Sequence, residues 1–281
     1  MREMPETRLE ILGVGPQKTA TSWLAEVLAP TGALCFPSGV KETFFWDRHF
    51  DRGIDWYMAH FNGHGRRIEF GPSYFHSAEV VERLHAHNPD LKVIVTLRDP
   101  AARSWSLYQH HLRKGRVGDS FEEADVRIPE IRQASRYSLH VPRWQKVFGR
   151  EQVLVLLQDE VQQDPGAVLA RVGRFIGEPL ETDSLDLGRQ VNAAGHPPSR
   201  ALASVSTRAA EILRNLGLYG AVNVAKSAGL KRIVYGGGTR GADAPPDDLR
   251  AQLVDEFEAD IAFVEHLLGI DLGHWRKVGS A

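Results

Sequence analysis

The sequence lacks several features that would point to particular classes of protein. It has a single cysteine, Cys35, in 281 residues. This excludes an internal disulfide and a zinc site built from several cysteines, and it is typical of a reducing compartment. A strong basic excess is also missing, since 34 Lys and Arg residues stand against 36 Asp and Glu residues. This balance argues against a nucleic-acid partner and weakens the case for a long polyanionic one, unless a basic cleft is hidden in the near-neutral total.

Long apolar runs are missing as well. No stretch approaches the roughly 20 apolar residues that a membrane-spanning helix requires. The start of the chain, MREMPETRLE, is charged and has no apolar run behind it long enough for a signal peptide. We therefore expect a soluble, cytoplasmic protein with no membrane partner. No repeat or clear boundary interrupts the chain, so we expect one domain over 1–281, with a core at about 8–185 and an elaborated C-terminal part at about 186–281.

Short apolar runs alternate with helical patterns along much of the chain. This alternation predicts an α/β fold with a mainly parallel sheet flanked by helices. Ligands of such sheets bind at the carboxyl ends of the strands. The expected strands are 9–12, 33–37, 67–70, 91–97 and 153–157, and the main expected helices are 77–87, 100–113, 137–147, 167–176, 200–216 and 248–268.

The stretch GVGPQKTATSWL, at 13–24, follows the first expected strand and opens a helix. A loop of this kind binds anions, because its N–H groups and the positive end of the helix face the same point. Lys18 adds a full charge, and Thr19, Thr21 and Ser22 add hydroxyl donors. The simpler alternative is a structural turn without a ligand.

This loop does not match the Walker A pattern of nucleoside-triphosphate-binding proteins. That pattern requires a glycine, four residues and then Gly-Lys-Ser/Thr. Counted back from Lys18 and Thr19, the two glycine positions hold Gln17 and Leu12. A tight wrap around a triphosphate is therefore not expected.

The segment QKTATSWL instead resembles the 5′-phosphosulfate-binding loop of sulfotransferases, whose common bacterial form reads QK-x-GT-[ST]-WL. Those enzymes have a P-loop-NTPase-like fold and use 3′-phosphoadenosine 5′-phosphosulfate (PAPS) as sulfuryl donor. The resemblance implies that Lys18 contacts the 5′-phosphosulfate and its bridging oxygen, and that the loop hydroxyls donate to the other oxygens. Ala20 replaces the usual glycine, and its small side chain should still admit close backbone approach. The implied donor-binding residues of this loop are Gln17, Lys18, Thr19, Ala20, Thr21 and Ser22.

A second family element is the arginine and serine that hold the 3′-phosphate of the donor. TLRDPAARSWSLY supplies Arg98 at the end of a strand and Ser106 eight residues later. An arginine fork suits a dianionic phosphate. The alternative is that Arg98 only pairs with Asp99 or caps a loop.

Two later segments also resemble the family. SRYSLHVPRW, at 135–144, resembles the segment after the 3′-phosphate helix, which implies that Tyr137 lies near the nucleotide. VNAAGHPPSR, at 191–200, resembles the loop that closes over the donor, and Arg200 is its candidate for a further 3′-phosphate contact.

The segment from Lys41 to Phe45 resembles the KE-x-x-FF segment of heparan sulfate sulfotransferases and their bacterial relatives. In that branch the glutamate is the general base for the acceptor hydroxyl, so the resemblance assigns this role to Glu42. The alternative is a surface salt bridge between Lys41 and Glu42, which is worth little. The aromatic residues Phe45 and Trp46 are either acceptor contacts or core.

The stretch EFGPSYF, at 69–75, resembles a family segment written EK-[TS]-P-x-YF, with one departure. Phe70 replaces a lysine that helps to stabilise the sulfuryl group in some members, which puts heparan-type acceptors in doubt. Arg66 or Arg67 is the alternative source of that charge. Tyr74 and Phe75 are expected to be pocket wall or core.

The predicted activity is O-sulfotransfer from PAPS to a small-molecule or carbohydrate acceptor, by in-line displacement. No metal is expected, because a sulfuryl group carries less charge than a phosphoryl group and no acidic partner for magnesium is evident. Two alternatives stay open: an ATP-dependent small-molecule kinase, and a non-catalytic nucleotide-binding protein of the same fold. The acceptor and the oligomeric state are not predicted.

Overall fold

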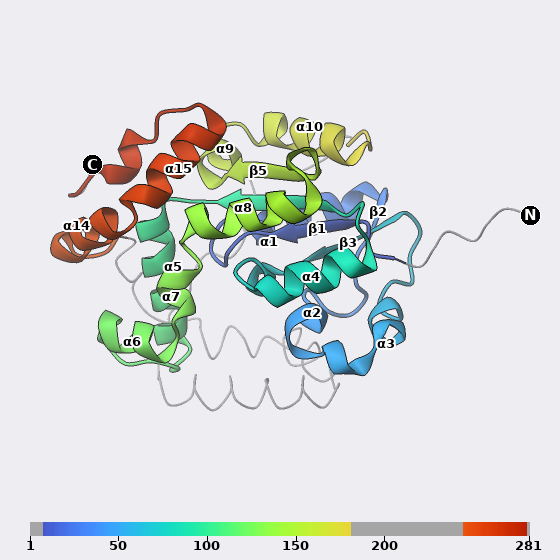
Figure 1. The fold of residues 1–281 in the computed structure, drawn as a ribbon, viewed down its shortest axis with the longest axis horizontal. Coiled ribbons are helices and arrows are strands. Elements are labelled where there is room, and N and C mark those ends of the chain that lie inside the picture. Colours follow the sequence, from blue (N-terminus) through green and yellow to red (C-terminus); the bar gives the residue numbers. More distant parts are fainter. Residues whose placement is uncertain (1–7, 181–243, 280–281) are drawn as a thin grey trace, which may run out of the picture. The chain divides into compact units, whose positions relative to one another are not determined.

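The computed structural model describes residues 8–180 and 244–279. It divides into two compact units. The first, here called the sheet unit, comprises Met1–Arg98 and Tyr137–Val191, and the second, the helical unit, comprises Asp99–Arg136 and Asn192–Ala281. The single domain expected from the sequence stays a prediction, and each unit is described by itself (Figure 1).

The sheet unit is built on five parallel strands in the order β2-β3-β1-β4-β5. β3 and β4 flank β1 on opposite sides, so the loops that follow β1 and β4 start from neighbouring strands in the middle of the sheet. Ligands of open α/β sheets bind at the carboxyl ends of such strands. The predicted parallel α/β fold is confirmed. The strands are β1 Ile11–Val14, β2 Leu34–Cys35, β3 Arg66–Phe70, β4 Lys92–Leu97 and β5 Val153–Leu157.

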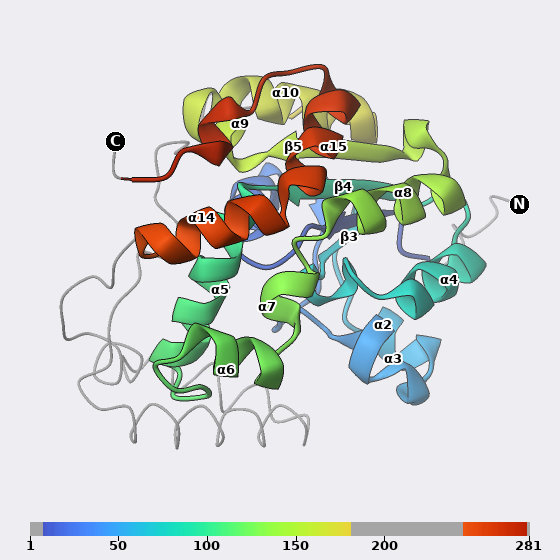
Figure 2. The ribbon, with the colours of Figure 1, turned by 60° about the vertical axis from the view of Figure 1, so that its left-hand side comes forward.

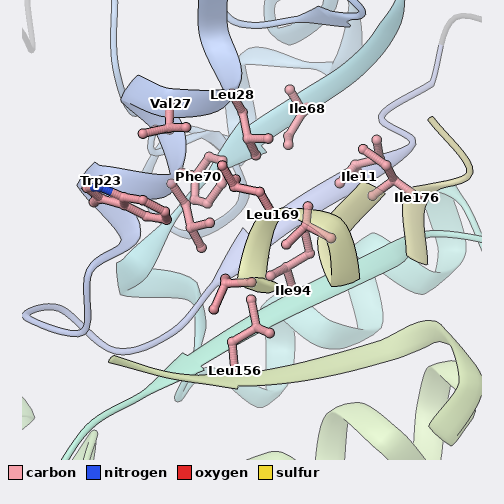
Figure 3. Close-up of a cluster of buried hydrophobic side chains, with 14 of the residues drawn as sticks. Ile11, Trp23, Val27, Leu28, Ile68, Phe70, Ile94, Leu156, Leu169 and Ile176 are labelled. Atoms are coloured by element: carbon pink, nitrogen blue, oxygen red, sulfur yellow. The ribbon is translucent and has the colours of Figure 1, made fainter. Parts of the chain in front are cut away.

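Helices cover the sheet through their apolar stripes. Helices α1 (Thr21–Leu28) and α10 (Pro165–Ile176) pack with strand residues such as Ile94 into one buried cluster (Figure 3). Helices α4 (Ala78–His87) and α8 (Tyr137–Phe148) contact each other and lie in front of the sheet in Figure 1. The shorter elements of this unit are η1 Ala29–Thr31, α2 Phe45–Arg48, η2 Phe50–Arg52, α3 Ile54–Met58, η3 Pro72–Tyr74, η4 Arg150–Gln152 and α9 Gln158–Gln163.

The described part of the helical unit contains α5 (Pro100–Arg113), α6 (Phe121–Arg127), α7 (Glu130–Gln133), α14 (Asp247–Glu256), α15 (Glu258–Leu268) and η5 (Gly273–Arg276). Helix α14 lies beside α5 (Figure 2), and Leu253 and Phe257 complete a core with Trp105 and Phe121. The single helix predicted for 248–268 is therefore wrong. The helix is interrupted at the buried Phe257, and no glycine or proline marks this position in the sequence.

Within 8–180 and 244–279, no helix is long and apolar enough to cross a membrane.

Candidate functional site

The loop between β1 and α1 bends through two residues with left-handed backbone conformations. Lys18 has φ 79° and Ala20 has φ 71°. Each such residue with a side chain costs about 1–2 kcal/mol. In the described part of the chain, the only other non-glycine residue with positive φ is Phe44, at 53°, two residues after Glu42. Strain of this kind concentrates at functional sites, and here it falls in the two segments that the sequence motifs single out.

The same loop is pressed against the carboxyl end of β4. Thr19 is fully buried, its hydroxyl donates to the carbonyl of Pro16 over 2.7 Å, and its oxygen lies 2.8 Å from the hydroxyl oxygen of Thr96. In this structure the Thr19 hydroxyl has partners within the protein, and its expected donation to a sulfate oxygen stays a prediction. The Thr19 side chain thus ties the loop to the carboxyl end of β4.

Helix α1 begins where the loop ends. Ala20 occupies its N-cap position without a side-chain hydrogen bond, and its first turn contains no acidic residue. The first N–H groups of a helix have no partner within it, and they carry the positive end of its dipole. This helix start suits an anion better than a cation. Thr21 in the first turn is buried, and Ser22 is half-buried.

Lys41 joins this loop to Glu42. Its ammonium group donates to the hydroxyl oxygen of Ser22 over 2.5 Å and lies 3.5 Å from Oε1 of Glu42. The Glu42 side chain is 23% exposed, so the carboxylate is accessible but partly enclosed. The Lys41–Glu42 ion pair considered above is present. Lys41 also contacts Ser22 in the first turn of α1, which a simple surface pair would not do.

A second carboxylate lies buried beneath this segment. Glu69, at 0% exposure, accepts hydrogen bonds at Oε1 from the Thr43 N–H (2.8 Å) and the Thr43 hydroxyl (2.6 Å). The hydroxyl of Tyr57 donates to Oε2 over 2.8 Å, and that of Tyr74 donates to Oε1 over 3.3 Å. Burial raises the pKa of Glu69, the hydrogen bonds from Thr43 and Tyr57 oppose that rise, and the charge of Glu42 adds to it. The motif comparison includes Glu69 but assigns it no role.

The four aromatic residues considered as acceptor contacts are closed off from solvent. Their exposed fractions are 1% or less, and Phe45 stacks on Tyr57 with ring centroids 4.7 Å apart. Their burial favours core packing over contact with an acceptor. These residues are Phe45, Trp46, Tyr74 and Phe75.

Phe70, at the family's lysine position, also belongs to the core. Its ring packs over Gly13, where an added Cβ would lie 2.2 Å from the ring, and it joins the cluster of α1 and α10 (Figure 3). Arg66 and Arg67 lie at the amino-terminal end of β3, whereas the β1–α1 loop follows the carboxyl-terminal end of β1 in the same parallel sheet. Arg66 pairs there with Glu10 over 3.1 Å. Neither arginine supplies the missing charge.

Arg98 follows the carboxyl end of β4 and is half-buried. The hydroxyl of Tyr137, itself fully buried, donates to the Arg98 carbonyl oxygen over 2.8 Å. Tyr137 therefore supports the backbone that carries the arginine. Ser106 is half-buried in α5 of the helical unit. Arg200 lies outside the described residues.

Asp99 has partners of its own within the helical unit. Its carboxylate accepts from the N–H of Ala101 over 3.0 Å, capping α5, and from Arg250 over 2.6 Å. Arg250 also donates to the carbonyl oxygens of Trp275 and Lys277. These contacts fasten the end of the chain to the start of α5.

Comparison with known proteins identifies the family. The family model of the sulfotransferase domain matches residues 9–191, more than half of the chain. The chain belongs to the sulfotransferase family.

The curated relatives are larger proteins. Human bifunctional heparan sulfate N-deacetylase/N-sulfotransferase 3 is 32% identical over 192 residues, which cover 60% of this chain and 22% of the relative. Bifunctional heparan sulfate N-deacetylase/N-sulfotransferase 1 of Caenorhabditis briggsae is 28% identical over 194 residues, covering 60% and 23%. The chain thus spans less than a quarter of the length of these relatives.

A solved sulfotransferase structure has a similar fold. The crystal structure of a sulfotransferase from Alicyclobacillus acidocaldarius has a TM-score of 0.66 at 24% sequence identity, and the match covers 96% of this chain and 99% of that one.

Proposed function

We propose that this protein transfers a sulfuryl group from PAPS to a hydroxyl of a small-molecule or carbohydrate acceptor, with Glu42 as general base. The observation that carries the proposal is the contact of Lys41 with both Ser22, in the first turn of α1, and Glu42. It brings a candidate base next to a candidate anion site, and both lie in the sheet unit.

The β1–α1 loop would bind the 5′-phosphosulfate of the donor substrate. Its N–H groups and the uncapped start of α1 favour negative charge. Lys18 would stabilise the charge that develops on the bridging oxygen as the bond to sulfur breaks. Gln17, Thr21 and Ser22 would complete the cradle.

Glu42 would accept the proton of the acceptor hydroxyl as its oxygen attacks sulfur. The new oxygen–sulfur bond forms while the bond from sulfur to the bridging oxygen breaks, and 3′-phosphoadenosine 5′-phosphate (PAP) leaves with the bonding electrons. Positioning in line supplies much of the rate, as in phosphoryl transfer. The loop and the Glu42 segment are both held in strained conformations, which supports a fixed alignment of this kind.

The 3′-phosphate of the donor would be recognised by Arg98 and Ser106. The hydrogen bond from Tyr137 to the Arg98 carbonyl holds the backbone of that arginine. Arg200 is proposed as a further contact from the resemblance alone.

The acceptor atom is the least constrained part of the proposal. The curated relatives are named for N-sulfotransfer as well as N-deacetylation. The lysine of the heparan-type pattern is replaced here by Phe70, whose side chain lies in the core. We therefore favour a hydroxyl acceptor, and the experiment below includes an amine so that nitrogen can compete with oxygen.

Binding and transfer are tested separately. Calorimetry with PAP and with ATP–magnesium distinguishes a sulfotransferase from a kinase. We expect PAP to bind and ATP–magnesium not to bind. Transfer of a labelled sulfuryl group from PAPS is then measured to a panel of 4-nitrophenol, an alkyl glucoside and N-deacetylated heparan sulfate. Mass spectrometry locates the sulfate on oxygen or nitrogen. Transfer to a panel member excludes the non-catalytic alternative.

The base is tested by Glu42→Gln, which keeps the shape of the side chain and removes its basicity. Loss of a general base lowers kcat by about 100- to 10,000-fold, whereas the Kd for PAP should not change. Full turnover in this variant would show that Glu42 is not the base.

A further inference from the structure

Glu69 is a buried carboxyl group surrounded by hydrogen-bond donors. Its carboxylate is fully enclosed and is surrounded by hydroxyl and N–H donors from Thr43, Tyr57 and Tyr74. Burying a carboxylate is costly unless its hydrogen bonds are made. An apolar residue at this position of β3 would have served packing alone, so the donors that Glu69 collects call for an explanation.

Two of those donors come from one residue in the Glu42 segment. The N–H and the hydroxyl of Thr43 both donate to Oε1 of Glu69, over 2.8 and 2.6 Å. The Thr43 hydroxyl oxygen in turn accepts from the N–H of Phe45 over 3.1 Å. Between these anchored groups lies Phe44, held at φ 53°. A strained turn persists only where its surroundings over-determine it, and the bonds through Thr43 do this here.

The turn begins next to Glu42, so whatever fixes Thr43 also fixes the backbone from which the Glu42 carboxylate extends. Lys41 is tied to Ser22 on the other side of Glu42. Glu42 therefore lies between Lys41, which is anchored to the first turn of α1, and Thr43, which is anchored to Glu69 in the sheet. This arrangement restricts the path of the chain on both sides of the carboxylate.

We propose that Glu69 is a positioning residue for sulfuryl transfer: through Thr43 it holds the strained turn at 42–44, and so aligns Glu42 with the acceptor hydroxyl. The inference rests on the proposed function, since it requires Glu42 to be the base. Glu69 itself is enclosed and does not contact substrate.

The obvious variant, Glu69→Met, would leave several buried donors unpaired and would threaten folding. A matched pair of substitutions avoids this, because Glu69 accepts hydroxyl bonds from two directions. Thr43→Val removes the hydroxyl on the turn side, at Oε1, and Tyr57→Phe removes the hydroxyl from α3, at Oε2. Each deletes one short bond to the same carboxylate, but only the first lies in the turn that carries Glu42.

Turnover is measured with labelled PAPS and the panel member that wild type sulfates fastest. A displacement of about 1 Å at a reacting group can cost about 100-fold in rate. We therefore expect Thr43→Val to lower kcat by about 10- to 100-fold, with the Kd for PAP and the KM for PAPS unchanged. Thr43→Ser, which keeps the hydroxyl, should restore kcat. Tyr57→Phe should lower stability without lowering kcat.

A second readout needs no turnover. Hydrogen–deuterium exchange of a peptide containing 41–45 should be faster in Thr43→Val than in wild type and unchanged in Tyr57→Phe.

Equal kcat values in Thr43→Val and Tyr57→Phe, or a loss of kcat that Thr43→Ser does not reverse, would overturn the positioning role. If Glu42→Gln is inactive while Thr43→Val is fully active, the inference fails and the proposed function stands. If Glu42→Gln turns over normally, the proposed base itself fails.

Discussion

Gly15 lies against Thr96 so closely that no side chain fits between the β1–α1 loop and β4. A Cβ on Gly15 would lie 2.3 Å from Oγ1 and 2.6 Å from the carbonyl oxygen of Thr96. The second contact is with backbone, which cannot swing aside. We therefore expect Gly15→Ala to displace the loop.

This displacement should weaken donor binding. The Kd for PAP in Gly15→Ala should rise at least about tenfold, which corresponds to about 1.4 kcal/mol. Gly118→Ala is the control, because an added Cβ at Gly118 meets nothing within 4 Å. Calorimetry of both variants decides the matter, and equal affinities would show that the loop tolerates the contact.

Ala20 offers a stabilising substitution. Its φ of 71° suits glycine, and a side chain in this region costs about 1–2 kcal/mol. Glycine has more conformational freedom in the unfolded chain, which lowers the free energy of unfolding by about 0.5–1 kcal/mol relative to alanine. Ala20→Gly should therefore raise the free energy of unfolding by about 0.5–1 kcal/mol. Ala25→Gly, inside α1 and 8% exposed, should lower it. Denaturant titration measures both, and a loss of stability in Ala20→Gly would contradict the strain argument.

Arg250 should matter more to stability than its charge alone suggests. Its pair with Asp99 is largely enclosed, with side chains 10% and 15% exposed. Removing one partner of a buried pair costs about 3–5 kcal/mol, and we expect Arg250→Met to lower the free energy of unfolding by about that amount. Arg276→Met is the comparison, because Arg276 pairs with Glu258 and Glu265, whose side chains are 51% and 23% exposed, and such solvent-accessible pairs contribute about 1 kcal/mol or less each. Similar losses in the two variants would be evidence against a dominant Arg250–Asp99 pair.

His87 should make stability depend on pH. Burial, and secondarily the charge of Arg8, lower the pKa of His87 below its ordinary value of 6.5. Its Nε2 accepts the N–H of Leu9 over 3.0 Å, which requires that nitrogen to be unprotonated. The unfolded chain therefore binds the proton more readily than the native one. The stability from His87 is present above pH 6.5 and is lost as the pH falls through the lowered native pKa.

His87→Gln tests this, because glutamine can accept a hydrogen bond without titrating. The free energy of unfolding of wild type should decrease more steeply than that of the variant below pH 6.5, by up to about 1.4 kcal/mol per pH unit for one proton. Other titrating groups are shared by both proteins and cancel in the difference. Parallel curves would mean that His87 does not contribute.

Sequence patterns predicted the sheet unit well where the signal is local. A run such as 91–97 is β-branched and apolar, and it forms β4 with only one boundary residue changed. The predicted strand at 9–12 is displaced, since β1 covers Ile11–Val14. Gly13 belongs to that strand because it leaves room for the ring of Phe70, a constraint that only the partner strand reveals.

The site was predictable in its motifs but not in how their side chains are used. The family resemblance pointed to Lys18 and Glu42, whose roles stay predictions, yet nothing in the sequence showed that the Thr19 hydroxyl turns inward to Thr96. In the sequence Glu69 is an ordinary charged residue, and its burial is explained only by the hydroxyls of Thr43, Tyr57 and Tyr74, which meet at its carboxyl group in the fold. Such networks are set by tertiary packing.

The core of the helical unit is assembled from the two sides of a long sequence interval. Trp105 and Phe121 pack with Leu253 and Phe257, whereas the sheet unit has all five of its strands by Leu157. During synthesis the sheet can therefore form while α5 still lacks the residues that cover it. Contacts this distant in sequence close late and slowly. The exposed apolar face of α5 is the part of the nascent chain that most needs protection, until the last helices leave the ribosome.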